Sequence, residues 1–196
     1  MLRLRRKSAR TDEALPVYMH PIEFSQLLAI VESIAARRCL EWGSGGSTRA
    51  LLERCPFIEH YVSVEHNAAW HAQVQKHVVD PRLSLNLVLP DVPGPAANAR
   101  KLDIEAWEAR AEDDRTLLRS YIEFPRSTGH AFDFVLVDGR ARNFCVAEGF
   151  SLLAPGGVLV IHDAQRTEYH AAIAALGRPT YLEPWESGQI CLVRKG

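Results

Sequence analysis

The sequence predicts an α/β fold: a doubly wound, mostly parallel sheet of seven strands with helices on both faces. Short β-rich runs alternate with amphipathic helical patterns, and 196 residues, 47% of them hydrophobic, suffice for one sizeable core. Repeats of strand and helix form parallel sheets through right-handed crossovers. The last two strand-like runs are too close in sequence for a crossover, so we expect the final strand to run antiparallel.

Each expected element follows from the hydrophobic pattern of its segment. Alternating or continuous β-rich runs between turn residues predict strands at 38–42, 60–65, 83–89, 132–138, 156–163, 179–185 and 188–195. Apolar residues at helical spacing predict helices at 22–34, 47–55, 67–79, 143–153 and 167–177. Asn67 is suited to cap the third helix, and Gly177 is suited to end the last.

The chain is expected to form a single domain, residues 21–196, after a flexible basic leader at 1–20. The first ten residues hold five basic side chains and no acid, whereas the whole chain has a net charge of −1. This balance disfavours a nucleic-acid partner. No apolar run resembles a membrane span or a signal peptide, so we expect a cytoplasmic protein; its oligomeric state cannot be read from the sequence. Four scattered cysteines predict buried thiols.

One long segment, at about 91–130, interrupts the alternation of strands and helices as an insertion. A structureless loop of this length is unusual in a compact domain. Apolar residues at partly helical spacing predict a loop and a helix beside the site, where the helix could act as a lid. An ordinary crossover helix explains the second half of the segment equally well.

The first strand ends in an acid followed by glycines, in the sequence LEWGSGGS. Ligands of doubly wound sheets bind at the carboxyl ends of the strands, where glycines allow close approach of the backbone. The dinucleotide pattern G-x-G-x-x-G fails, because Thr48 stands at its third glycine. Glu65 ends the second strand, where an acid can hold ribose hydroxyls. Glu41 would repel a pyrophosphate but suits an ammonium group, which we expect it to face directly or through water.

Four stretches, LEWGSGGS, VSVEHN, FDFVLVDGRAR and LLAPGGVLVIHD, resemble the successive motifs of class I S-adenosylmethionine-dependent methyltransferases. The resemblance spans about residues 38–163 and is strongest to the small bacterial-type branch of methyltransferase-like proteins. It implies a Rossmann-like seven-stranded sheet with a reversed last strand and S-adenosylmethionine as cofactor. The implied cofactor-binding residues are Glu41, Gly43, Ser44, Gly45, Gly46, Ser47, Glu65, His66 and, as a weaker candidate at the adenine end, Asp91.

Polar residues also follow the fourth and fifth strands, in VDGRARN and IHDAQR. Methyl transfer requires an aligned acceptor and, for a hydroxyl acceptor, a base. Asp138 and His162 are nearly equal candidates for this base, and Asp163 completes the expected catalytic set. Metal-dependent catechol-type O-methyltransferases carry two acids and an Asn here. Asp138 and Asp163 match the acids but Ala164 replaces the Asn, so a divalent metal is the less favoured alternative.

Three arginines, Arg140, Arg142 and Arg166, lie near the same strand ends and would bind an anionic acceptor through their guanidinium groups. Pairing with neighbouring acids explains them equally well. The sequence therefore predicts a methyltransferase that acts on an O or N atom of an unidentified small-molecule acceptor. The alternatives are a non-catalytic S-adenosylmethionine-binding domain and, on the same fold, an NAD(P)-linked or aminopropyl-transferring enzyme.

Overall fold

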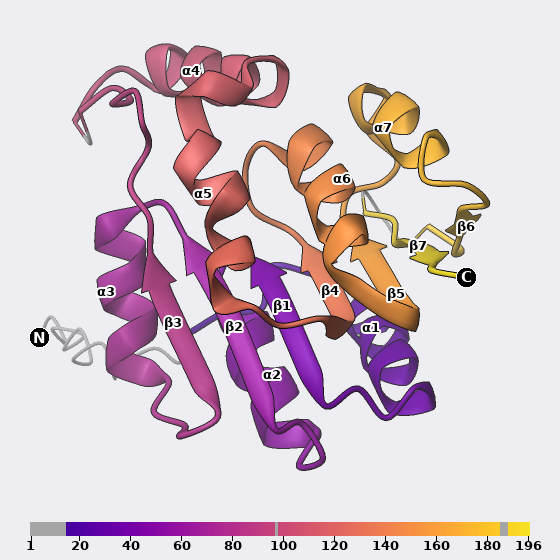
Figure 1. Ribbon diagram of the computed structural model, residues 1–196. Helices are drawn as coiled ribbons and strands as arrows, with labels where there is room; N and C mark the ends of the chain where they lie inside the picture. The colour runs from indigo at the N-terminus through magenta and orange to yellow at the C-terminus, as the bar shows by residue number, and fades with distance from the viewer. Residues whose placement is uncertain (1–14, 97, 185–187) are drawn as a thin grey trace, which may run out of the picture.

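The computed structural model describes residues 15–96, 98–184 and 188–196, which form a seven-stranded sheet in the order β3-β2-β1-β4-β5-β7-β6 (Figure 1). Its strands are β1 (Arg38–Trp42), β2 (His60–Glu65), β3 (Leu83–Leu87), β4 (Phe132–Val137), β5 (Leu153–Ile161), β6 (Thr180–Tyr181) and β7 (Cys191–Arg194). The α-helices are α1 (Pro21–Ser33), α2 (Gly46–Arg54), α3 (Ala68–His77), α4 (Lys101–Asp113), α5 (Arg119–Glu123), α6 (Arg142–Leu152) and α7 (His170–Ala174).

The sheet is parallel except at β7, which runs antiparallel to both β5 and β6. This confirms the predicted fold class and the reversed last strand. The strand order reverses between β1 and β4, where a doubly wound sheet opens a crevice. Trp42 is in register with Val64 of β2 and Val137 of β4, and Val137 is in register with Ile161 of β5. The residues that follow these four strands therefore meet at one edge.

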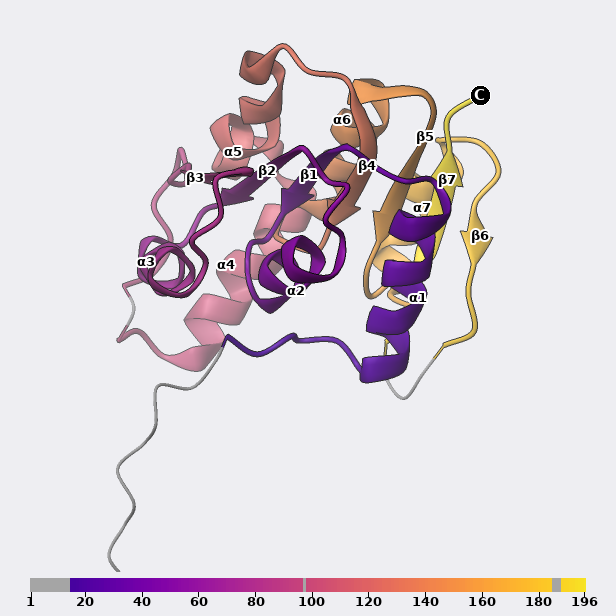
Figure 2. The same ribbon diagram turned by 90° about the horizontal axis from the view of Figure 1, so that it is seen from below.

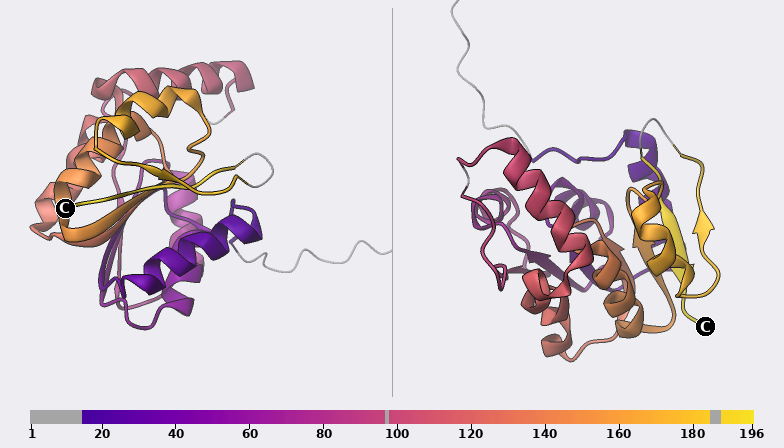
Figure 3. Two further views of the ribbon diagram at one scale, coloured as in Figure 1. Left: turned by 90° about the vertical axis from the view of Figure 1, so that its right-hand side faces the viewer. Right: turned by 90° about the horizontal axis from the view of Figure 1, so that it is seen from above.

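Two hydrophobic cores lie on opposite faces of the sheet, because alternate strand residues point to opposite sides. One core joins strand residues such as Phe134 and Val160 to α1, α2 and α3, and the other joins Trp42 and Val135 to α5, α6 and α7. Figures 2 and 3 show these two helix layers with the sheet between them. All four cysteines are free and buried, as predicted.

Several elements differ from their expected bounds. β5 begins at Leu153, three residues before its expected start at 156, and Gly156 and Gly157 pair with Lys195 near the carboxyl terminus. The helix expected at 167–177 is divided into a 3-10 turn, Thr167–Tyr169, and the short α7. β6 has two residues only. None of the helices in the described parts of the chain has both the length and the apolar composition of a membrane span.

The insertion folds into helices rather than a bare loop. It contains α4, a 3-10 turn at Arg115–Leu118, α5 and a second 3-10 turn at Phe124–Thr128. α4 lies beyond the carboxyl ends of the parallel strands, and α5 packs against α6 on the sheet face (Figure 1). The predicted helix beside the site is therefore present.

Residues 15–20, which were expected to belong to the leader, are part of the domain instead. Leu15 and Met19 are buried in the core that also contains α1 and α2. A Cβ at Gly46 would come within 2.3 Å of the Pro16 carbonyl oxygen, so this segment lies directly on the start of α2. Residues 1–14 of the expected leader lie outside the described residues.

Two glycines allow the chain segments after β1 and β4 to cross. A Cβ at Gly43 would lie 2.7 Å from the Cα of Gly139, and a Cβ at Gly139 would lie 2.1 Å from the Tyr121 hydroxyl oxygen. Gly43 also has a φ of 94°, a conformation that disfavours other residues. The crossing thus leaves no room for side chains at either position.

We predict that Gly139→Ala lowers the free energy of unfolding by about 2 kcal/mol through overpacking. Adding Tyr121→Phe should recover part of that loss, because it removes the atom nearest to the new methyl group. Urea unfolding of the parent, both single variants and the double variant would measure this coupling. Strictly additive effects would contradict the proposed contact.

Candidate functional site

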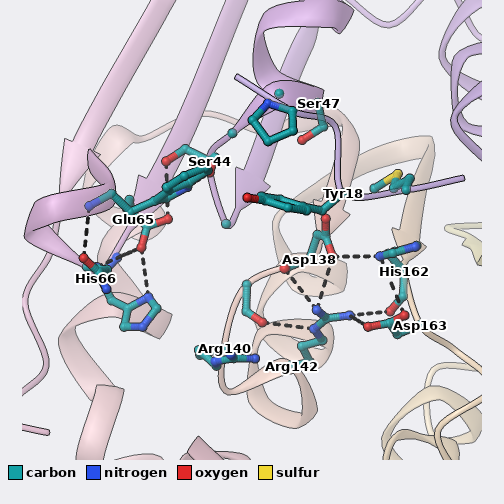
Figure 4. A pocket seen from close by; sticks show the side chains of 18 of the residues that line it. Tyr18, Ser44, Ser47, Glu65, His66, Asp138, Arg140, Arg142, His162 and Asp163 are labelled. Atoms are coloured by element: carbon teal, nitrogen blue, oxygen red, sulfur yellow. Dashed lines mark hydrogen bonds and ion pairs between the residues drawn. The ribbon is translucent and has the colours of Figure 1, made fainter. Parts of the chain in front are cut away.

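A cavity of about 490 Å³ opens at the carboxyl ends of β1, β2, β4 and β5. Its walls come from the segment 16–19, the glycine loop, the start of α3, the loop after β4, the end of β5, and Glu108 of α4. The predicted residues that line it are Gly43, Ser44, Gly45, Gly46, Ser47, Glu65, His66, Asp138, Arg140, Arg142, His162 and Asp163. Figure 4 shows the two halves of this site, with the glycine loop and Glu65 on one side and Asp138 and His162 on the other.

Glu65 is held at the end of β2 with one side of its carboxylate satisfied by the backbone. Oε1 accepts hydrogen bonds from the backbone N–H groups of His66 and Asn67, at 2.9 and 2.8 Å. Oε2 has only a long contact, 3.4 Å, with the hydroxyl of Ser44. Because Glu65 lines the cavity, this second oxygen is available to accept hydrogen bonds from a ligand.

Two aromatic side chains that the sequence reasoning missed support this half of the cavity. The indole N–H of Trp70 donates to the carbonyl of Ser44 at 2.6 Å, which fixes the glycine loop against α3. Trp107 of α4 stacks on His66 with ring centroids 6.4 Å apart. Trp70 and Trp107 read in the sequence as ordinary apolar helix positions, so no local signal separated them from core residues.

Glu41 does not occupy the place expected for it. Its side chain is fully buried and does not line the cavity. Its carboxylate instead accepts hydrogen bonds from the hydroxyls of Ser47, Thr48 and Ser63. Burial raises the pKa of Glu41 to about 7. The expectation of direct contact with a ligand is therefore corrected: in the described part of the chain, Glu41 is hydrogen-bonded to Ser47, and Ser47 lines the cavity.

Asp91, the weaker candidate for an adenine end, also has another role in this structure. Its carboxylate accepts the backbone N–H of Ser120 at 2.7 Å and the Ser120 hydroxyl at 2.6 Å. It is exposed and does not line the cavity. Asp91 thus ties the loop after β3 to the start of α5.

The side of the cavity at the ends of β4 and β5 holds a compact group of charged residues. The Nδ1 atom of His162 lies 2.9 Å from Asp138 Oδ1, and the Arg142 guanidinium lies 3.2 Å from the same oxygen and 3.4 Å from Asp163 Oδ2. Asp163 has a φ of 58°, an uncommon conformation for a residue with a side chain. The structure therefore brings the three predicted catalytic residues together at the ends of β4 and β5.

The three predicted substrate-binding arginines all have carboxylate partners. Arg142 is buried, pairs with both aspartates and donates to the backbone carbonyls of Gly139, His162 and Asp138. Arg140 pairs with Glu108 at 2.6 Å. Arg166 pairs with Asp163 at 2.9 Å and does not line the cavity. The contacts of these arginines thus agree with the alternative prediction, that they pair with neighbouring acids.

Three further residues belong to this half of the site without having been predicted. Tyr18 and Met19 line the cavity from the segment before α1, and buried Glu23 of α1 lies 3.6 Å from His162 Nε2 through its Oε2 atom. An acid three residues after a helix cap ordinarily indicates a capping box, which Glu23 also forms. Among the described residues, no three acidic, Cys or His side chains are placed to hold a metal ion.

We predict that Glu41 makes the protein less stable as pH rises. The folded-state pKa of about 7 exceeds the ordinary value of 4.5. At pH values between the two, Glu41 is therefore protonated in the folded protein and ionised in the unfolded chain. Relative to Glu41→Gln, the free energy of unfolding of the parent should fall by up to about 3 kcal/mol as pH rises through this window, and stay level above it. Denaturant unfolding from pH 4.5 to 8.5 would test this, and parallel curves for both proteins would contradict it.

Neither a protein-family model nor a curated protein sequence matches the chain. Solved structures do match it. A methyltransferase-like protein from Silicibacter pomeroyi is 23% identical, with a TM-score of 0.63 over 93% of this chain and 90% of that one. The O-methyltransferase TomG from Streptomyces achromogenes, solved with S-adenosylmethionine, is 18% identical, with a TM-score of 0.56 over 91% and 82%.

A third similar structure is the N-methyltransferase NodS from Bradyrhizobium japonicum, solved with S-adenosylhomocysteine. It is 14% identical, with a TM-score of 0.51 over 88% of this chain and 85% of that one. At these identities the likeness shows the fold. The chain therefore has the fold of S-adenosylmethionine-dependent methyltransferases of the O and N types.

Proposed function

We propose that the chain is an S-adenosylmethionine-dependent methyltransferase that acts on an O or N atom of a small-molecule acceptor. The observation that carries this proposal is the cavity itself, which joins a glycine loop and Glu65 to an Asp138–His162 pair across the reversal point of the sheet. Its volume of about 490 Å³ is in the range of pockets that bind small molecules. Similar structures solved with S-adenosylmethionine or S-adenosylhomocysteine support the choice of cofactor.

The residues present fit the cofactor at its ribose. Glu65 Oε2 can accept hydrogen bonds from a ribose diol, because Oε1 already takes both neighbouring backbone N–H groups. His66, stacked on Trp107, provides a flat surface next to Glu65 for a base.

The glycine loop would hold the methionine end. Gly43, Gly45 and Gly46 expose the backbone there, and Ser47 presents its hydroxyl to the cavity with its proton directed to Glu41. The Ser47 oxygen is thereby oriented to accept a hydrogen bond from an ammonium group. Glu41 therefore acts on the ligand through Ser47 in this proposal.

The acceptor would bind beside Asp138 and His162. When bound, the cofactor supplies an electrophilic methyl group, so the chain needs to align the acceptor atom and take up its proton. Tyr18 and Met19 would help to exclude water from this half, since they cover it from the segment before α1. An anionic acceptor would require Arg140 to exchange Glu108 for the ligand, as Arg142 is already committed to two aspartates.

Calorimetric titration with S-adenosylhomocysteine tests the cofactor assignment, with NADH as the control ligand. We expect saturable binding of S-adenosylhomocysteine alone. Binding of NADH alone would assign the cavity to an oxidoreductase. Binding of neither ligand by folded protein would overturn the proposal.

We further predict that Glu65→Ala weakens S-adenosylhomocysteine binding at least tenfold, because two ribose hydrogen bonds to a charged group are lost. Glu59→Ala is the matched control, as Glu59 is an exposed acid that pairs with Arg37 near the opposite end of β2. The dissociation constants of both variants come from the same titration. Equal affinities for the two variants would contradict the placement of the ribose.

A further inference from the structure

Glu23 is a buried acid that caps α1 and also lies next to His162. It is 3% exposed, and its Oε2 atom accepts the backbone N–H of His20 at 2.9 Å. The same oxygen lies 3.6 Å from His162 Nε2. Its other oxygen, Oε1, has no hydrogen-bond partner among the described residues, and neither has His162 Nε2. Two buried polar groups thus face each other across a short gap.

His162 therefore lies between carboxylates on both of its ring nitrogens. Nδ1 contacts Asp138 Oδ1 at 2.9 Å and Nε2 faces Glu23, while Asp163 Oδ1 is 4.0 Å from Nδ1. Two arginines lie close to these acids: Arg142, whose guanidinium donates to the backbone carbonyl of His162 at 2.6 Å, and Arg166, which pairs with Asp163 at 2.9 Å. Three acids thus lie around the ring, Glu23 from α1 and two aspartates from the segments after β4 and β5, and the two arginines pair with the aspartates.

The carboxylates on both sides of the His162 ring favour a proton on each of its two nitrogens. A neutral imidazole carries one N–H and would turn the lone pair of its other nitrogen towards one of the two carboxylates. An imidazolium donates from both nitrogens and leaves no such repulsion. Burial lowers the pKa of His162, but the hydrogen bond and charge of Asp138 and the charge of Asp163 outweigh it, so the pKa is raised.

We infer that Glu23 is a positioning residue that keeps His162 in its imidazolium form, so that Asp138 and not His162 accepts the proton of the methyl acceptor. This inference rests on the proposed function and decides between the two bases that the sequence left nearly equal. Asp138 Oδ2 has no hydrogen bond to any described residue, and Asp138 lines the cavity. Figure 4 shows its carboxylate anchored by His162 and Arg142.

With the cofactor bound, Asp138 Oδ2 would take up the proton of the acceptor O–H or N–H group. The electron pair released on the acceptor atom would form the new bond to the methyl carbon, and the pair of the broken carbon–sulfur bond would remain on sulfur. The acceptor class that fits is a hydroxyl or amine that can donate a hydrogen bond to a carboxylate.

Glu23→Gln separates this role from capping. The Gln side chain keeps an oxygen that can accept the His20 N–H, so α1 retains its cap, but the negative charge beside His162 is gone. Glu32→Gln is the matched control, because Glu32 is an exposed acid on the same helix.

The measurement is NMR titration of the His162 ring in protein without cofactor, with the signal assigned by its absence in His162→Gln. We expect His162 to titrate about one pH unit lower in Glu23→Gln than in the parent, and to be unchanged in Glu32→Gln. Unchanged titration in Glu23→Gln would overturn the inference. Because no cofactor is present, this result is independent of whether the protein binds S-adenosylhomocysteine.

A second observable does not depend on a variant of Glu23. The ring ¹⁵N shifts of parent His162 at pH 7 should show both nitrogens protonated. A neutral ring with one protonated nitrogen would overturn the inference even if Glu23→Gln failed to fold.

Discussion

The close crossing of the chain after β1 and β4 is the constraint on which the site depends. Gly43 and Gly139 can approach because neither has a Cβ, and Tyr121 fills the space beside them. The register that joins Trp42 to Val64 and Val137 then places the ends of three strands level with one another. A ligand that spans the cavity would meet Glu65 from one strand and Asp138 from another. Packing in the two cores thus fixes the distances between polar groups that the sequence separates widely.

Charge at this edge is balanced within the protein. Glu41 is surrounded by hydroxyls, and Arg142 binds two aspartates and three backbone carbonyls, so few buried charges lack a partner. Such networks are costly when half satisfied. At the gap between Glu23 and His162, an imidazolium of the form inferred above would present an N–H to a carboxylate from each ring nitrogen. The two halves of the cavity therefore differ: Glu65 Oε2 has only a long contact with Ser44, whereas Asp138, His162 and Arg142 are paired with one another.

The sequence could predict what depends on local pattern. β1 and β2 have the predicted bounds because their runs are apolar and end in turn residues, and the residues just after each buried strand did gather at one edge. The sequence could not predict hydrogen bonds and ion pairs between residues that lie far apart in the chain. The arginines were paired by Glu108, Asp138 and Asp163, Glu41 by hydroxyls on α2 and β2, and Asp91 by Ser120. Residues 15–20 have no periodic pattern, so their burial over α2 depends on tertiary contacts alone.

We propose that one ligand spans both halves of the cavity, with its ribose at Glu65 and its reacting end at Asp138. A crystal structure of the protein with S-adenosylhomocysteine would test this placement. We expect ribose oxygens within hydrogen-bond distance of the Glu65 carboxylate and the ligand sulfur directed to the Asp138 side of the cavity. A ligand bound away from Glu65, or with its sulfur facing α3, would contradict it.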